Sequence, residues 1–112
     1  ILVDEAQFLK KHHVLQMCRV CVELGIPVMC YGIRTDFRGE LFEGSGSLLA
    51  LADNLIELKT VCNECSRKAT MVVRLNEDGR VGTVGSNVQI GGNVVYRVLC
   101  RMHFNEATKL LD

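Results

Sequence analysis

The chain opens with Ile1-Leu2-Val3-Asp4-Glu5, an apolar run that ends in two acidic residues. A short apolar run of this kind is typical of a strand buried inside a parallel sheet. In open α/β folds, ligands bind at the carboxyl ends of the strands, and the two acids lie at such an end. The run therefore predicts a central strand with a ligand site at its tip. Such a strand needs neighbours, so we expect the chain to be a fragment of a longer protein whose other strands lie upstream.

The next residues continue an alternation of helix and strand. Apolar side chains at helical spacing predict a helix over residues 10–24, and Gly25 is placed to end it as a C-cap. Residues 26–31 and 55–61 predict two more strands, separated by a loop over 32–46 and a short helix over 47–53. This order is that of a parallel α/β sheet with crossover helices.

The pattern changes after residue 61, which we take as the boundary between two domains, 1–61 and 62–112. Residues 68–75 and 88–99 predict extended stretches of a β-ribbon, and the Asp78-Gly79 pair predicts a turn after the first of them. Residues 103–111 predict a short helix. The second domain is therefore expected to be a small β-ribbon lobe beside the α/β part.

Two pairs of metal-ligand residues lie in this lobe, Cys62-x2-Cys65 and Cys100-x2-His103. Tetrahedral zinc takes four such ligands, and four protein ligands leave no position for water, so the spacing predicts a structural zinc site. The alternative is that the cysteines are buried apolar thiols and that His103 caps a helix. Cys18-x2-Cys21 has the same spacing, but it falls inside the predicted helix and is expected to be core packing.

The acids at the end of the first strand suit phosphoryl transfer. Neighbouring residues on a strand point in different directions, so Asp4 and Glu5 can have separate roles. Asp4 fits the binding of Mg²⁺, and Glu5 fits the acceptance of a proton from the nucleophile. The alternative for this pair is a solvated strand end.

The composition limits the classes of function. Lys and Arg together number 13, as do Asp and Glu, so no basic excess indicates a nucleic-acid partner or a membrane surface. No apolar run approaches the roughly 18 to 20 residues that span a bilayer. Six cysteines without a recognisable signal segment favour a reducing, cytoplasmic environment, in which paired cysteines commonly bind metal.

Several stretches together resemble type II thymidine kinases, most closely the bacterial branch. They are residues 4–9 (DEAQFL), residues 31–42 (YGIRTDFRGELF), and the two ligand pairs flanking Ile90-Gly91-Gly92-Asn93 and Tyr96. The resemblance implies a P-loop NTPase (RecA-like) α/β domain, partial here, with a zinc-binding β-ribbon lobe. It also implies a cytosolic enzyme that moves the γ-phosphoryl of ATP to the 5′-hydroxyl of thymidine, giving dTMP.

The resemblance also assigns roles to single residues. Glu5 would be the general base, and Asp4 would be linked to Mg²⁺ and ATP. The thymine pocket would be walled by Phe8, Ile33, Phe37 and Phe42. Gln89, Gly91 and Tyr96 would lie on the lasso, a loop that covers the nucleoside. Without the resemblance, ordinary core aromatics and a glycine bulge would explain these residues. No role is assigned to Arg34 or Arg38.

One departure from the family pattern concerns ATP. The glycine-rich loop ending in Gly-Lys-Ser or Gly-Lys-Thr that cradles the phosphates has no counterpart in these residues. We therefore expect the C-terminal part of a kinase, inactive by itself. Relatives also imply feedback inhibition by dTTP and a homotetramer.

Two other functions stay open at this point. A zinc-ribbon module that binds nucleic acid or protein would call for a basic face and exposed aromatic residues. The neutral charge, with two tyrosines, four phenylalanines and no tryptophan, argues against it. Another RecA-like ATPase would share the acidic strand end but would leave the Cys/His pairs unexplained.

Overall fold

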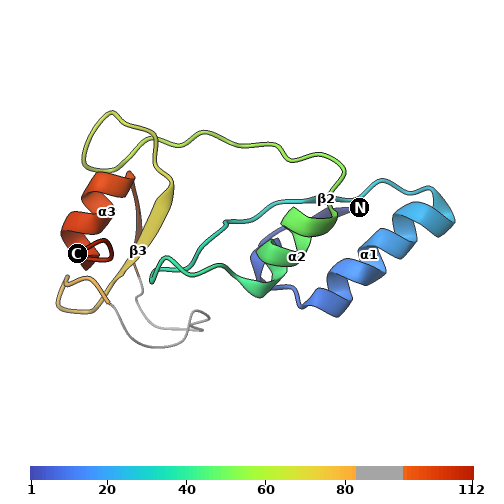
Figure 1. Ribbon diagram of the computed structural model, residues 1–112, viewed down its shortest axis with the longest axis horizontal. Helices are drawn as coiled ribbons and strands as arrows, with labels where there is room; N and C mark the ends of the chain where they lie inside the picture. Colours follow the sequence, from blue (N-terminus) through green and yellow to red (C-terminus); the bar gives the residue numbers. More distant parts are fainter. Residues whose placement is uncertain (83–94) are drawn as a thin grey trace. The chain divides into compact units, whose positions relative to one another are not determined.

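The computed structural model describes residues 1–82 and 95–112 (Figure 1). The chain forms two compact units. The first unit contains Ile1–Arg34 and Leu41–Ile56, and the second contains Thr35–Glu40 and Glu57–Asp112. The second unit thus includes the short segment Thr35–Glu40, although the stretches on both sides of this segment belong to the first unit. Each unit is described by itself below.

A β-α-β crossover organises the first unit. Strand β1 (Leu2–Val3) pairs in parallel with β2 (Met29–Cys30), and helix α1 (Lys11–Leu24) connects them. Gly25 ends α1 with a φ of 64°, a left-handed conformation that glycine adopts without steric cost. The predicted helix, its glycine cap and the parallel pairing are confirmed. The strands are shorter than predicted, because ladder pairing covers only two residues on each.

Helix α2 (Glu43–Leu51) packs on the 3-10 helix η1 (Ala6–Phe8). Gly44 makes this packing close, since a Cβ there would lie 2.6–2.9 Å from the carbonyl oxygens of Leu9, Ala6 and Gln7. The helix predicted over 47–53 therefore begins earlier, at Glu43, and ends at Leu51. Its start is set by the packing of the backbone at Gly44. The sequence does not reveal this start, because a stretch rich in glycine and serine is typical of a loop.

The strand predicted over residues 55–61 is wrong. Within the part of the chain that the structure describes, these residues form no strand, and only an isolated bridge joins Val61 to Lys68. Leu55, Ile56 and Leu58 are 65%, 78% and 72% exposed. A strand depends on packing against neighbours, and the segment finds none among the described residues.

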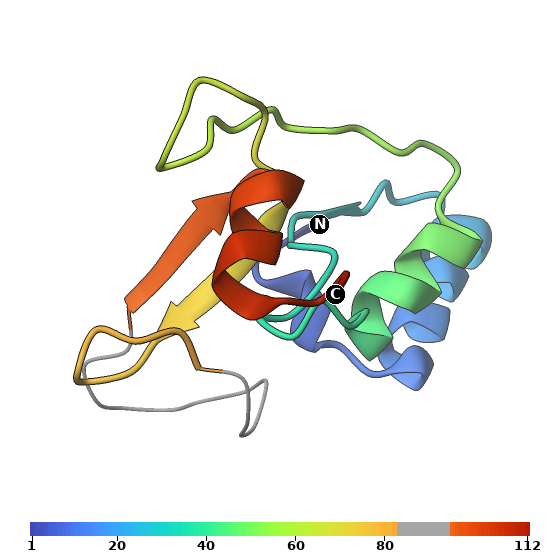
Figure 2. The same ribbon diagram turned by 60° about the vertical axis from the view of Figure 1, so that its left-hand side comes forward.

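An antiparallel ribbon and one helix form the second unit (Figure 2). Strand β3 (Met71–Leu75) pairs with β4 (Val95–Leu99), with Met71 opposite Leu99 and Leu75 opposite Val95. Helix α3 (Arg101–Thr108) packs on one face of this ribbon. The core beneath it consists of Cys62, Val73, Leu99, Cys100 and Phe104.

The ends of these elements agree with the predictions in part. Gly79 has a φ of 81°, and the N–H of Asn76 donates to the carbonyl of Arg80 over 2.7 Å, which confirms the predicted turn. The helix predicted over 103–111 runs from Arg101 to Thr108, because Cys100 caps its start and Lys109 turns left-handed at φ 58°. Residues 88–94 of the second predicted strand lie outside the described residues. Among the described residues, no helix has the length and apolar character needed to cross a bilayer.

Candidate functional site

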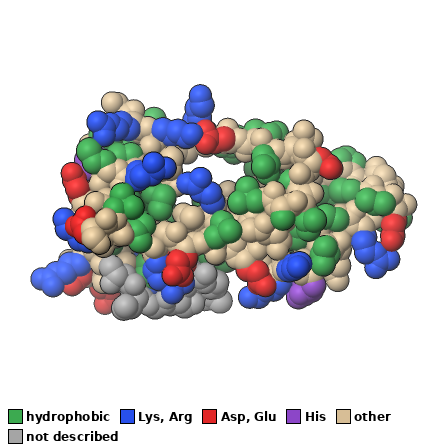
Figure 3. Space-filling view, viewed as in Figure 1, with side chains coloured by type: hydrophobic (Ala, Val, Ile, Leu, Met, Phe, Trp, Pro, Cys, Tyr) green, Lys and Arg blue, Asp and Glu red, His purple; other side chains and the backbone are tan. Residues whose placement is uncertain are grey.

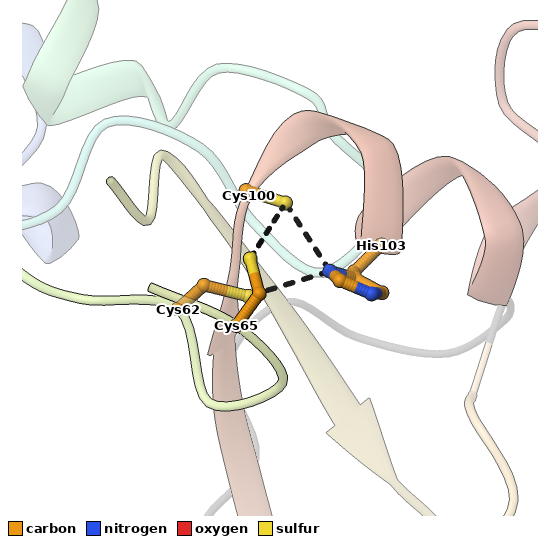
Figure 4. Close-up of side chains that lie close together, drawn as sticks. All are labelled: Cys62, Cys65, Cys100 and His103. Atoms are coloured by element: carbon orange, nitrogen blue, oxygen red, sulfur yellow. Dashed lines mark hydrogen bonds between the residues drawn. The ribbon is translucent and has the colours of Figure 1, made fainter. Parts of the chain in front are cut away.

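The two predicted ligand pairs come together in the second unit (Figure 4). The three sulfur atoms and a ring nitrogen of His103 all lie within 4.8 Å of one another. Cys65 Sγ is 3.8 Å from Cys100 Sγ, and His103 Nδ1 is 3.3 Å from Cys100 Sγ. We call Cys62, Cys65, Cys100 and His103 the metal cluster. Three thiols and one imidazole at this separation could hold a metal ion such as zinc.

Local backbone structure points the ligands inward. The N–H groups of Glu64 and Arg67 donate to the sulfurs of Cys62 and Cys65, each over 3.4 Å, as in a tight knuckle turn. Cys100 follows β4 and caps α3, which places His103 one turn into the helix. The expected strand before Cys62 is absent, so this knuckle follows an irregular segment.

Hydrogen bonds to the sulfurs set their protonation. Burial alone raises the pKa of Cys62, but backbone N–H groups, that of Cys100 foremost, outweigh it and bring the pKa to about 6. The N–H of His103 lowers the pKa of Cys100 in the same way. The hydrogen bond between the His103 ring and Cys100 raises the pKa of His103. Cys62 is thereby stabilised as the thiolate, which is the form that binds metal. The Nε2 of His103 lies 3.9 Å from a Glu106 carboxylate oxygen, which is within ion-pair range but longer than a hydrogen bond.

The second acid of the opening run lies where β1 gives way to η1. Glu5 has φ 53° and ψ 41°, a left-handed conformation that is uncommon for a residue with a side chain. The Oδ1 of Asp4 accepts the Glu5 N–H over 2.9 Å. The Nε2 of Gln7 donates to Oε2 of Glu5, and the Oε1 of Gln7 accepts the Ile33 N–H over 3.3 Å. We call Asp4, Glu5 and Gln7 the carboxylate site.

Three of the residues predicted to wall the nucleoside pocket lie in the first unit. Phe8 and Phe42 meet edge to face, with ring centroids 5.6 Å apart. Phe42 is buried, whereas Phe8 and Ile33 are 45% and 47% exposed. Phe8 and Ile33 thus present apolar surface to solvent, and Phe42 supports Phe8 from beneath.

The other predicted pocket residues belong to the second unit. Phe37 is buried, and the guanidinium of Arg74 lies 3.7 Å from the centre of its ring. Tyr96 is opposite Arg74 in the β3–β4 ladder and is half exposed. Gln89 and Gly91 lie outside the described residues. Phe37 and Tyr96 thus both neighbour the buried Arg74, Phe37 through its ring and Tyr96 across the β3–β4 ladder.

Comparison with protein families gives these features a context. A family model described as thymidine kinase matches residues 1–104. The chain belongs to the thymidine kinase family. It is 60% identical over 107 residues to a thymidine kinase of Rhodopirellula baltica, covering 96% of this chain and 50% of that protein. It is 58% identical over 107 residues to that of Novosphingobium aromaticivorans, covering 96% and 55%. It is 58% identical over 109 residues to that of Yersinia pestis, covering 97% and 55%. The chain thus spans about half the length of these curated relatives.

The surface of this thymidine kinase family chain bears on the nucleic-acid alternative. On the face drawn in Figure 3, Lys and Arg side chains are interspersed with Asp and Glu side chains. Ion pairs such as Arg97 with Glu64 and Lys68 with Glu57 bring opposite charges into contact. Within the second unit, Arg97 and Lys68 thus each contact an acidic side chain, whereas a phosphate backbone is bound by basic side chains of a single sign.

Sequence reasoning missed three residues of this thymidine kinase family chain. Gln7 and Ser45 hold the chain after β2, and Arg74 stacks on Phe37. Gln7 lay inside the quoted DEAQFL stretch, between Ala6 and Phe8, and a polar residue placed there is a usable signal. Arg74 interrupts the apolar strand Met71–Leu75, but a charged residue at an alternating strand position is ordinarily exposed, so the sequence carries no signal of its burial. Ser45 carried no signal, because it sits among glycines.

Proposed function

We propose that this chain is the nucleoside-binding part of a thymidine kinase that transfers the γ-phosphoryl of ATP to the 5′-hydroxyl of thymidine, giving dTMP. The observation that carries the proposal is the Glu5 carboxylate, which follows a parallel strand and is held by Gln7 in a chain of the thymidine kinase family. Ligands bind at this end of the strands in open α/β sheets.

Glu5 is proposed as the general base that accepts the proton of the 5′-hydroxyl. A base must have a fixed position within hydrogen-bond reach of its proton, and the Gln7 contact supplies such a constraint. Asp4 is proposed to hold Mg²⁺ that accompanies ATP, because an exposed carboxylate is the donor that this cation prefers. The metal ion would neutralise charge on the phosphates during transfer.

Thymidine is proposed to lie against Phe8 and Ile33, with Phe42 packed behind Phe8. The exposure of Phe8 and Ile33 and the burial of Phe42 support this arrangement within the first unit. Phe37 is proposed as a further wall of the thymine pocket because of family membership. Gln89, Gly91 and Tyr96 are proposed to contact the nucleoside from the lasso. Main-chain groups near Gln89 and Gly91 would bond the base edge, which carries both donors and acceptors.

The metal cluster is proposed to hold structural Zn²⁺. Four protein ligands complete a tetrahedral shell, and three thiols with one imidazole are a common zinc set. The ion would tie the loop after residue 61 to the start of α3.

The wider assignments rest on family membership. We propose that residues 1–61 belong to a P-loop NTPase (RecA-like) kinase domain and that residues 62–112 form the zinc-binding lobe. We also propose a cytoplasmic homotetramer inhibited by dTTP.

A hybrid enzyme tests the activity directly. In it, this chain replaces the matching segment of the Yersinia pestis thymidine kinase, to which it is 58% identical. Transfer of labelled phosphate from ATP to thymidine, with uridine and cytidine as controls, is the assay. We expect turnover that prefers thymidine, together with a rise in Tm on adding thymidine alone. A folded, zinc-containing hybrid without thymidine phosphorylation would contradict the proposal.

A further inference from the structure

The amide of Gln7 joins two parts of the first unit that lie far apart in sequence. Its side chain is buried, at 3% exposure. Its Nε2 donates to Oε2 of Glu5, and its Oε1 accepts the backbone N–H of Ile33 over 3.3 Å. A buried amide normally has partners for its polar atoms, and here one partner is the proposed base while the other is a proposed pocket wall.

The orientation of this amide is determined by its two partners. Turning it over would place its oxygen against the Glu5 carboxylate and its NH₂ against the Ile33 N–H. Both contacts would then be repulsive. Gly32 leaves room for the arrangement, since a Cβ at this position would lie 2.6 Å from Oε1 of Gln7. The backbone N–H of Ala6 donates to the carbonyl of Tyr31 over 2.8 Å and keeps the two segments in register.

Ile33 is held from its other side by α2. The hydroxyl of Ser45 donates to the Ile33 carbonyl over 2.5 Å. Both main-chain polar groups of Ile33 are thus bonded to side chains, one from η1 and one from α2. The Ile33 side chain, 47% exposed, is therefore presented by a backbone that has little freedom to move.

We infer that Gln7 is a positioning residue that sets the Glu5 carboxylate and the Ile33 pocket wall at a fixed separation. This inference rests on the proposed function. The side-chain NH₂ of Gln7 donates to Oε2 of Glu5. The other carboxylate oxygen of Glu5, its Oε1, is then the one that accepts the proton of the 5′-hydroxyl. The left-handed backbone at Glu5 turns the carboxylate toward Gln7 rather than along the strand, and such strain is typical of functional positions.

Two substitutions of Gln7 in the hybrid enzyme separate its contacts. Gln7→Glu keeps an acceptor for the Ile33 N–H but sets a second carboxyl group against Glu5 in place of the amide donor. The two carboxyl groups would share a proton, so we expect kcat to fall about 10-fold or more, with the thymidine KM within about twofold. Gln7→Leu loses both contacts, so kcat should fall and KM should rise. Gln16→Leu, on the exposed side of α1, is the matched control and should leave both constants unchanged. Equal effects of Gln7→Glu and Gln7→Leu on KM would overturn the inference.

A double-mutant cycle excludes general damage to the fold. In the Glu5→Gln background the carboxylate is gone, so adding Gln7→Leu should lower kcat little further. A variant that only loosens the structure would multiply the two losses, and that result would overturn the inference.

A readout without turnover keeps this inference apart from the proposed function. In the ¹⁵N–¹H spectrum of the hybrid enzyme, the Gln7 side-chain NH₂ should exchange slowly, and Glu5→Gln should shift its signals while Glu23→Gln should not. An intact signature in a hybrid that lacks kinase activity would reject the kinase assignment and retain the positioning contact. If the Gln7 side-chain NH₂ exchanges fast and its chemical shifts do not change in Glu5→Gln, the contact between Gln7 and Glu5 is rejected.

Discussion

The carboxylate site and the metal cluster are assembled by different means. In the metal cluster, four side chains converge on one point, and each pair comes from one short turn of the chain. In the carboxylate site, the acid is placed by contacts to the backbone of segments far away in sequence, through Gln7, Gly32 and Gly44. The metal cluster depends on two short local turns of the chain, whereas the carboxylate site depends on the packing of η1 against α2 and the chain after β2.

The largest expected effect breaks the metal cluster. In the hybrid enzyme, Cys65→Ser should reduce bound zinc from about one per chain to near zero, because a three-ligand remnant holds the ion poorly. The second unit should then lose its cooperative melting. Zinc is measured by atomic emission after gel filtration. Cys18→Ser removes a thiol of the other C-x2-C pair and should leave the zinc content unchanged; equal loss in both variants would refute the proposed ligand set.

The next effect separates chemistry from structure. Glu5→Gln should lower kcat by about 10²-fold or more, as expected when a general base is lost, with thymidine binding nearly intact. Steady-state kinetics and the thymidine-induced rise in Tm measure the two quantities. Zinc content should not change, since the residue belongs to the first unit. Unchanged turnover would remove Glu5 from the role of base.

A smaller effect probes the packing on which the carboxylate site depends. Gly44→Ala should destabilise the hybrid by about 1–3 kcal/mol, because the new methyl group meets three carbonyl oxygens. Thermal unfolding should show a Tm lower by several degrees, with reduced kcat. Gly46→Ala in the same helix meets only a Leu41 side chain and should be neutral or slightly stabilising. If both alanines behave alike, the tight contact of α2 with η1 is absent.

The smallest expected effect concerns the aromatic pair. Phe42→Leu removes the edge-to-face contact with Phe8, which is worth about 0.5–1.5 kcal/mol beyond buried area. The thymidine KM should rise severalfold, while kcat should change little. Leu41→Ala, a neighbouring exposed side chain, serves as the control. An unchanged KM for Phe42→Leu would show that Phe8 does not need this support.

The difference between the two sites also explains what could be predicted from the sequence. The metal cluster could be predicted from the spacing of its two ligand pairs, Cys62 with Cys65 and Cys100 with His103, and the structure brings these pairs together. The helix ending at Gly25 and the turn at Gly79 were equally local, because each rests on one glycine with positive φ. Gln7 stood out only as a polar residue between Ala6 and Phe8, and Ser45 did not stand out, since their partner Ile33 is brought near only by the fold.

The errors have a related cause. The strand predicted over 55–61 rested on a short apolar run and its place in the helix–strand order. Such a run forms a strand only when it packs beside another strand, and it has no such neighbour among the described residues. The start of α2 was misplaced because Gly44 disfavours a helix in isolation yet permits the contact with η1. Burial of Arg74 on Phe37 could not be inferred from alternation, which would have placed the charge in solvent.

The assignment of Thr35–Glu40 to the second unit has a consequence for dissecting the protein. The polypeptide passes from one unit to the other at residues 34–35, 40–41 and 56–57, so no single cut separates them. A protease that cuts the exposed stretch after Leu51 would leave the two units joined through Thr35–Glu40. The buried carboxylate of Asp36 stabilises this segment by bonding to Arg38. Expressing residues 57–112 alone would remove Phe37 from beneath Arg74 and leave a buried guanidinium without its aromatic cover. The second unit is thus discontinuous in sequence, because one of its buried rings, that of Phe37, comes from the segment Thr35–Glu40.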